Sequence, residues 1–140
     1  MIGREPTELE QKIFYAVRDA RDAAIQTIEQ AFAAGRPIYG FQADDAAREV
    51  IRRAGFGEYF THRTGHSIAA ELHGSGAHLD NLETHDERQI LPNTCFSVEP
   101  GVYLPASFQP QFGVRSEVNM LTTAGRAWVT GPRQQELVRI

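Results

Sequence analysis

The sequence has 140 residues, of which 41% are hydrophobic, 9% aromatic and 23% charged, as is typical of one globular domain. Its net charge is −4, from 14 Lys plus Arg against 18 Asp plus Glu. No basic block occurs and no apolar run approaches the ~20 residues of a membrane span, so we expect neither a nucleic-acid nor a membrane partner. A single cysteine, Cys95, excludes an internal disulfide framework and favours a cytoplasmic protein.

The first segment with a clear pattern predicts a long helix. Thr7 and Glu10 have the spacing of a capping box, and Gly35–Pro37 would end the helix. Between them, apolar residues recur at steps of three and four, which indicates one buried stripe opposite a polar face. The stripe comprises Leu9, Ile13, Phe14, Val17, Ala20, Ala24, Ile25, Ile28 and Phe32.

A second, shorter helix is predicted from near Ala43 to Ala54. Its inward residues are Ala46, Ala47, Val50 and Ile51. We interpret Asp44 and Asp45 as its solvated start, where acidic side chains favour the positive end of the helix dipole. Both helices are interpreted as scaffold rather than as carriers of chemistry.

From Gly55 onward the sequence changes to short β-type runs separated by Gly, Pro and polar residues. The predicted strands are Thr64–Leu72, Thr94–Glu99, Gly101–Leu104, Gly113–Leu121 and Trp128–Thr130. Polar, Gly- or Pro-containing stretches at Gly74–Asp86 and Pro105–Pro110 predict loops. Two helices followed by a run of strands predict an α+β fold, with residues 1–140 as a single domain.

All five histidines lie between His62 and His85, and His62, His66 and His73 fall within one short run. Isolated histidines are more often surface or structural groups than ligands. Here Gly65 leaves room beside His66, and neighbouring apolar residues predict that part of the run is buried. Because a buried neutral imidazole offers one acceptor nitrogen, as a metal ligand must, these residues are candidates for a metal site.

Carboxylates occur in two further unusual settings. Glu99 ends an apolar strand just before Pro100, so it should be protonated, paired or bound to a metal. Period-two alternation places Arg115 and Glu117 on one face of a later strand, and taken alone that pattern is better explained by a plain solvated face. Together, His66, Glu99 and Glu117 form a ligand set suited to Mn, Fe, Co or Zn.

Three segments carry a family resemblance: His62–Ile68, Phe96–Tyr103 and Gly113–Glu117. In this order and spacing they resemble the C-terminal half of the M24 peptidases, the pita-bread metallopeptidases. That family includes Xaa-Pro dipeptidases (prolidases), Xaa-Pro aminopeptidases and methionine aminopeptidases, and the resemblance is strongest for the prolidase-like branch. The helical segment Ala46–Ile51 also looks like the family. The resemblance implies a partial pita-bread domain, with helices packed on a curved, mainly antiparallel sheet.

By position, the resemblance implies that His66, Glu99 and Glu117 bind metal. Glu99 would also handle the proton of the attacking water, and Glu117 would bridge two metal ions. His62 and His73 match histidines near the substrate that steady the scissile amide. Glu99, His73 and His62 are thus the implied catalytic residues.

Arg115 looks like an outer partner that holds the carboxylates in place. Family members use two further ligands, both aspartates, on strands that precede the helices. The segment Met1–Thr7 resembles the stretch just after the second of those strands, and Asp44 and Asp45 lie in the wrong context to replace them. We therefore expect an N-terminally truncated catalytic domain that is incomplete or inactive as an isolated chain. It would bind one divalent metal (Mn, Co, Zn or Fe) weakly, or none.

Two alternatives stay open. A partner chain could supply the missing aspartates and complete a hydrolase in trans, or the fold could serve as a non-catalytic binding or scaffolding module with a peptide ligand. Because a sheet that lacks strands has exposed edges, we also expect self-association, most simply as a homodimer.

Overall fold

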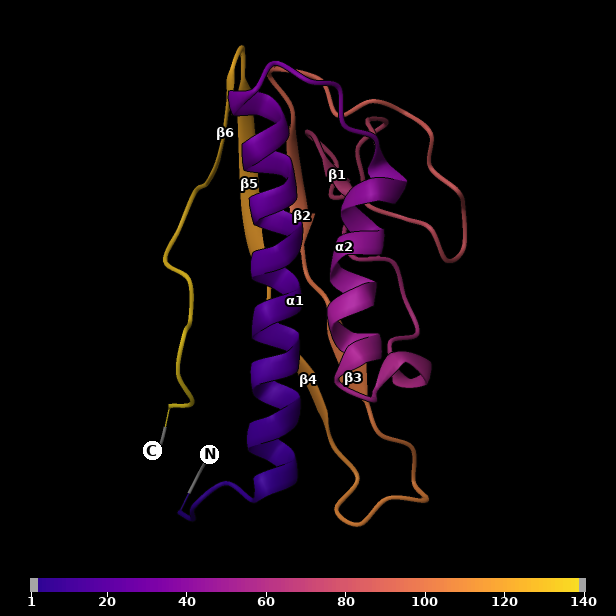
Figure 1. Ribbon diagram of the computed structural model, residues 1–140, viewed down its shortest axis with the longest axis vertical. Coiled ribbons are helices and arrows are strands. Elements are labelled where there is room, and N and C mark those ends of the chain that lie inside the picture. The colour runs from indigo at the N-terminus through magenta and orange to yellow at the C-terminus, as the bar shows by residue number, and fades with distance from the viewer. Residues whose placement is uncertain (1–2, 139–140) are drawn as a thin grey trace.

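The computed structural model describes residues 3–138, and two helices form one layer that packs against antiparallel strands (Figure 1). The long helix α1 (Glu8–Ala33) runs along the strands of the sheet, and α2 (Gly40–Arg53) packs beside it. A single 3-10 turn, η1 (Gly57–Tyr59), follows α2. Within residues 3–138, no helix is both long and apolar enough to cross a membrane. Of the start segment considered above, Met1 and Ile2 lie outside the described residues.

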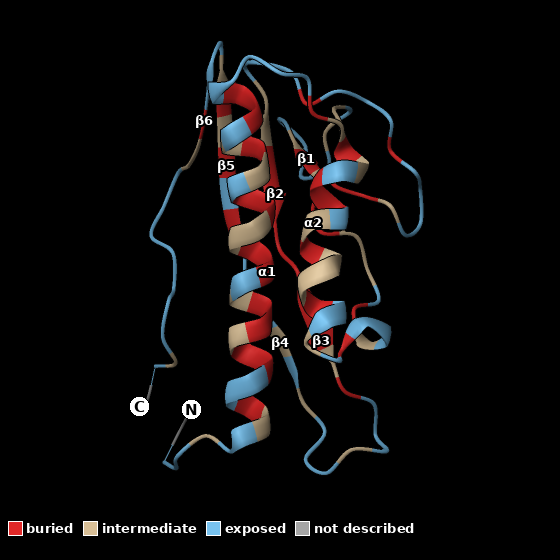
Figure 2. Cartoon of the chain, viewed as in Figure 1, coloured by how far each residue is buried: buried red, intermediate tan, exposed pale blue. Residues whose placement is uncertain are grey.

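Helix α1 confirms the predicted capping box and buried stripe. Thr7 Oγ1 accepts a hydrogen bond from the Glu10 amide, and the Thr7 amide donates to Glu10 Oε2 over 2.7 Å. Arg4 lies 2.7 Å from the same carboxylate, and together with the Thr7 amide it lowers the pKa of Glu10 to about 2. One face of the helix is buried along its whole length (Figure 2), which gives the core its largest apolar surface.

Helix α2 begins at Gly40, earlier than the predicted Ala43, because Gln42 Oε1 reaches back to accept from the Tyr39 amide over 3.1 Å. The interpretation of Asp44 as a solvated residue is wrong: its side chain is 0% exposed. Asp45 is exposed, as expected. The acidic pair therefore divides between the interior and the surface.

Four strands form the main sheet in the order β1-β2-β5-β6, with every neighbouring pair antiparallel. They are β1 (Ser67–Ile68), β2 (Cys95–Val98), β5 (Val118–Thr123) and β6 (Arg126–Val129). β2 and β6 confirm the predicted strands Thr94–Glu99 and Trp128–Thr130 to within two residues at each end. The two predicted loops contain no helix or strand.

A second, two-stranded sheet pairs β3 (Gly101–Tyr103) with β4 (Gly113–Arg115). The prediction of one continuous strand over Gly113–Leu121 is therefore wrong, because the chain passes from β4 in one sheet to β5 in the other. Between β2 and β3 the chain makes the same change of sheet at Pro100, which has no amide hydrogen to donate to a ladder. The two breaks lie side by side, because the Pro100 carbonyl accepts from the Ser116 amide over 3.2 Å. Both candidate glutamates, Glu99 and Glu117, lie at this paired break.

The predicted strand Thr64–Leu72 is reduced to the two residues of β1. Two flanking carbonyls still pair with β2 and its end, because the Ser97 amide donates to the His66 carbonyl over 2.9 Å and the Glu99 amide donates to the Thr64 carbonyl over 2.7 Å. The other flanking groups bond elsewhere. The Thr64 amide donates to a carboxylate of α2, Gly65 exchanges two hydrogen bonds with Leu79, and the Ala69 amide donates within a turn. The histidine-bearing segment is thus mostly irregular, and its position depends on contacts from other elements as well as on its few backbone bonds to β2.

Candidate functional site

All six residues singled out in the sequence line one open cavity of about 410 Å³. The cavity lies against the break between the two sheets on one side and against the histidine segment on the other. Its lining comprises His62, Arg63, His66, Leu72, His73, Glu83, Glu99, Arg115 and Glu117. The fold therefore gathers the predicted site, although its residues span more than 50 positions of the chain.

His66 and Glu99 form the centre of the site. The Glu99 side chain is nearly buried, and its Oε1 lies 3.4 Å from Nε2 of His66. Nδ1 of His66 lies 3.0 Å from the Ser67 carbonyl oxygen, which can only accept, so Nδ1 carries the proton. In the neutral ring the lone pair is then on Nε2 and faces the carboxylate. Two acceptors that face each other need a cation or a proton between them.

A second chain of hydrogen bonds links His62 to Glu99. Nδ1 of His62 donates to the Arg63 carbonyl, which leaves Nε2 to accept from the Tyr103 hydroxyl over 3.0 Å. Arg115 donates through Nε to the Tyr103 oxygen over 2.8 Å and through Nη1 to Glu99 Oε2 over 3.0 Å. Burial, with a smaller contribution from the charge of Arg115, lowers the pKa of His62 and keeps the ring neutral near pH 7.

His73 approaches the centre from a loop. Its ring lies 4.4 Å from the ring of His66, centroid to centroid. The loop closes over Ser67, whose carbonyl oxygen accepts from the Gly74 amide over 2.7 Å and whose hydroxyl accepts from the Gly76 amide. His73 itself is exposed.

Glu117 lies in the same cavity but does not join His66 and Glu99 in a compact ligand group. Among residues 3–138, no three His, Cys, Asp or Glu side chains are close enough to hold a metal ion together. The predicted alternation is confirmed, since Val118 and Met120 are buried while Glu117 is exposed on the other face. His66 and Glu99 thus provide two donors that fit a divalent ion, with Glu117 available nearby.

Sequence reasoning missed Ser97, which connects the two central residues. This hydroxyl is 0% exposed, accepts from the His66 amide over 3.0 Å and donates to Glu99 Oε1 over 2.9 Å. Gly65 packs directly against the Ser97 carbonyl oxygen, which would lie 1.9 Å from an added Cβ. The available signal was the polar Ser97 within the apolar run that ends at Glu99.

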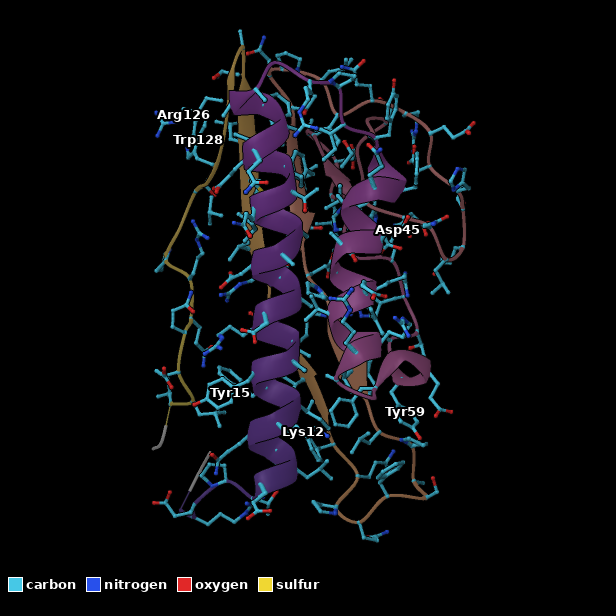
Figure 3. The ribbon with its side chains drawn as sticks, viewed as in Figure 1. Lys12, Tyr15, Asp45, Tyr59, Arg126 and Trp128 are labelled. Carbon is cyan, nitrogen blue, oxygen red and sulfur yellow. The ribbon has the colours of Figure 1, made fainter. Side chains whose placement is uncertain are left out.

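Arg21 is also a correction, because the helical pattern places it on the polar face and the structure buries it completely. Nη1 donates to Ser116 Oγ over 2.8 Å and to the Gln134 carbonyl over 2.9 Å. Nearby, Tyr15 points from α1 toward the C-terminal segment (Figure 3), and its hydroxyl donates to Glu136. These contacts hold Ser116, which lies between Arg115 and Glu117, and they attach the C-terminal segment to α1.

Comparison with known proteins decides the family. The sequence matches metallopeptidase family M24 over residues 1–124. The chain belongs to metallopeptidase family M24. The Xaa-Pro dipeptidase of Lactobacillus delbrueckii subsp. lactis is 35% identical over 101 residues, which are 72% of this chain and 25% of that protein.

Solved M24 structures share the fold. A dipeptidase from Pyrococcus horikoshii OT3 superposes with a TM-score of 0.81 and 31% identity over 99% of this chain and 35% of that one. A prolidase from Thermococcus sibiricus gives a TM-score of 0.80 with 27% identity, covering 97% of this chain and 33% of that one. The expected pita-bread architecture is confirmed. The chain spans about a quarter to a third of the length of these relatives.

Proposed function

We propose that this M24 chain is part of the catalytic domain of an Xaa-Pro dipeptidase and supplies His66, Glu99 and Glu117 to its metal site. The observation that carries the proposal is the approach of His66 Nε2 to Glu99 Oε1, at 3.4 Å, in a cavity that also contains Glu117. The kinship with Xaa-Pro dipeptidases and prolidases supports the choice of reaction.

The donor set fits a divalent ion of the Mn, Fe, Co or Zn type, because it combines one imidazole nitrogen with carboxylate oxygens. The tautomer of His66 supports this fit, since the Ser67 carbonyl holds the proton on Nδ1 and leaves Nε2 free to bind. A divalent ion there would polarise a water molecule or the scissile carbonyl.

The remaining roles belong to side chains on the cavity wall. Glu99 turns Oε1 toward the cavity, where it can take a proton and return it, while Arg115 holds Oε2. Neutral His62 and exposed His73 are placed to hydrogen-bond the amide of a dipeptide ligand. Leu72, exposed at the same cavity, offers an apolar contact for its side chains.

We further propose that residues 1–140 are the C-terminal part of the catalytic domain, and that two aspartate ligands come from strands outside these residues. The coverage of a quarter to a third of the relatives supports this division. On this proposal the 140 residues alone do not hydrolyse Xaa-Pro dipeptides, because the remaining donors are too few to organise the ions. Hydrolysis of a dipeptide ending in proline by the purified chain with added Mn²⁺ would overturn it.

Titration with Co²⁺, followed by its visible absorption, tests the metal site without requiring turnover. The wild type should bind one Co²⁺, and Glu99→Gln should weaken binding by at least about tenfold. Glu87→Gln is the matched control, since Glu87 is exposed and does not line the cavity. Equal Co²⁺ affinity of Glu99→Gln and the wild type would refute the assignment.

One observation favours a second candidate, a non-catalytic peptide-binding module. Both oxygens of Glu99 already have partners in the chain, with Ser97 on Oε1 and Arg115 on Oε2. A cavity whose carboxylate is already hydrogen-bonded by the protein could bind a peptide without a metal ion, through hydrogen bonds alone. Calorimetry with a Xaa-Pro dipeptide in the presence of EDTA distinguishes the two candidates, because only the binding module keeps its affinity without metal.

Self-association through a sheet edge belongs to the same proposal. β6 has no neighbour on its outer side among the described strands, and its Arg126 and Trp128 lie at that edge (Figure 3). A homodimer or a partner that supplies the missing ligands would cover it, and light scattering over a range of concentrations reports either. The free, half-buried Cys95 supports a cytoplasmic location.

A further inference from the structure

Asp44 is a buried carboxylate on α2 that the proposed chemistry does not use. Its side chain is 0% exposed and accepts three hydrogen bonds. The donors are Arg48 Nε at 2.5 Å, the Thr64 amide at 2.8 Å and the Asn81 amide at 2.8 Å. A buried carboxylate is costly unless it is fully bonded, and here one guanidinium and two backbone amides offset that cost. The two amides belong to separate segments of the chain, so Asp44 fixes both segments against α2.

Arg48 extends the same arrangement toward the site. Its Nη2 donates to the His62 carbonyl over 2.6 Å, and its Nη1 donates to the Phe60 carbonyl over 3.2 Å. The guanidinium also lies over the Phe60 ring, 4.3 Å from its centroid, and that ring packs edge-on against His62. One planar guanidinium therefore holds the backbone on the N-terminal side of the histidine segment.

The two side chains reach both flanks of the cavity. Through Thr64 and His62 they hold the segment that carries His62 and His66. Through Asn81, Asp44 also holds the loop in which Asp80 accepts from the Glu83 amide, and Glu83 lines the cavity. Backbone bonds contribute as well, since the Ser97 amide donates to the His66 carbonyl and the Glu99 amide donates to the Thr64 carbonyl. These two bonds reach neither His62 nor the loop at Asn81, which Arg48 and Asp44 hold.

We propose that Asp44 and Arg48 are positioning residues of the M24 site: they hold the His62–His66 segment and the Glu83 loop in register across the cavity. The inference rests on the proposed function for its chemical meaning. Its structural part does not depend on that function: side chains of one helix, α2, hold two walls of the cavity in place. Neither residue touches the reacting atoms, and both act through backbone groups of residues that do.

The test compares Asp44→Asn with Asp45→Asn, the same change one residue along on the exposed side of α2 (Figure 3). Arg48→Lys is the second variant, because it keeps the charge beside Asp44 but loses the donors to the Phe60 and His62 carbonyls. Two-dimensional NMR then measures amide exchange at Thr64 and Asn81, and the ¹⁵N shifts of the His62 ring report its tautomer.

We expect exchange at Thr64 and Asn81 to rise at least about tenfold in Asp44→Asn, because each amide loses a bond to a charged acceptor. In Arg48→Lys the His62 ring should become a mixture of tautomers. Amides of α1 and β2 should keep their protection in both variants. Asp45→Asn should leave Thr64 exchange and the His62 tautomer as in the wild type, because Asp45 accepts from the Asn81 side chain and not from the Thr64 or Asn81 amide.

Unchanged exchange and an unchanged His62 tautomer in both variants would overturn the inference. Equal acceleration at α1 and β2 would also overturn it, since it would make the pair a general stabiliser rather than a positioning device. Co²⁺ titration separates this outcome from failure of the proposed function. A wild type that binds no Co²⁺ refutes the metal site, whereas the NMR results still decide the positioning role.

Discussion

Glu99 and Arg115 reach the cavity from the ends of antiparallel strands, whereas His62, His66 and His73 lie on a segment with only two strand residues. On the carboxylate side, ladder hydrogen bonds of β2 with β5 and of β3 with β4 fix the backbone. On the histidine side, backbone bonds from Ser97 and Glu99 hold only His66 and Thr64, and side chains of other elements hold much of the rest. The same cavity thus has one wall built by regular structure and one built by individual contacts.

This difference affects how each wall should respond to mutation. In a strand ladder many backbone hydrogen bonds hold the same segment, so that one side chain can be replaced with little displacement of the backbone. A segment held by a few side chains depends on each of them, because a buried backbone amide that loses its partner costs about 1–3 kcal/mol. Single substitutions should therefore disturb the histidine wall more than the carboxylate wall.

The largest effect is expected where the two walls touch. Gly65→Ala would place a Cβ 1.9 Å from the Ser97 carbonyl oxygen, so the histidine segment must move away from β2. We expect the free energy of unfolding to fall by about 3 kcal/mol in urea denaturation. Gly131→Ala, whose Cβ would meet nothing within 4 Å, should stay within about 0.5 kcal/mol of the wild type. Wild-type stability of Gly65→Ala would contradict the close packing of the walls.

Ser97→Ala removes the hydroxyl that bridges the walls. The His66 amide and Glu99 Oε1 would each lose a buried partner, so stability should fall by about 2 kcal/mol. The His66 amide should also exchange faster, while amides of β5 keep their protection. Ser107→Ala in an exposed loop is the control. If exchange rises equally across the sheet, the hydroxyl stabilises the fold as a whole and does not join the walls.

Thr7→Ala provides a reference remote from both walls. Loss of the helix cap should lower the free energy of unfolding by about 1 kcal/mol, as is usual for a capping threonine. Because the cap lies outside the cavity, the NMR signals of His62 and His66 should not move. A shift of those signals would show that α1 transmits its stability to the histidine wall.

The smallest effect is a dependence on pH that belongs to the histidine wall. Burial lowers the pKa of His62 and of His78, so the unfolded chain binds protons more readily than the folded one. Stability should therefore fall as the pH drops below about 6.5, where the unfolded histidines begin to protonate. Glu10 acts in a separate window, since its stabilisation is lost only as the pH falls from 4.5 to about 2.

In His62→Gln the fall in stability below pH 6.5 should become shallower in chemical denaturation measured at a series of pH values. His85→Gln, a change at an exposed histidine, is the control and should keep the wild-type slope. If the stability of His62→Gln falls with decreasing pH as steeply as that of the wild type, His62 does not cause the pH dependence.

The walls also differ in how well the sequence predicts them. The run that ends at Glu99 is apolar and breaks at Pro100, and both features are local, so strand β2 and its terminal carboxylate could be predicted. Asp44 and Arg21 could not, because the partners that bury them are distant in the sequence: the Thr64 amide for Asp44 and Ser116 for Arg21. From sequence alone, a buried charged residue in a helix looks like a solvated one, because its hydrogen-bond partners become visible only in the three-dimensional structure.

The residues that line the cavity could be predicted because three motifs coincide, whereas the contacts that support them could not. His62, His66 and Glu99 belong to short local patterns, but the contacts that hold them come from α2, Ser97 and the loop after His73. Periodicity also predicted a strand over Thr64–Leu72, since it records side-chain alternation and not where the backbone hydrogen bonds go.

The central claim is that His66, Glu99 and Glu117 present one divalent-ion site. The most direct measurement is paramagnetic line broadening of NMR signals during titration with Mn²⁺, which detects even a weakly bound ion. Our proposal predicts that signals of these three residues broaden first and that Glu99→Gln abolishes the effect. Broadening centred on surface carboxylates such as Glu49, or none at millimolar Mn²⁺, would contradict it.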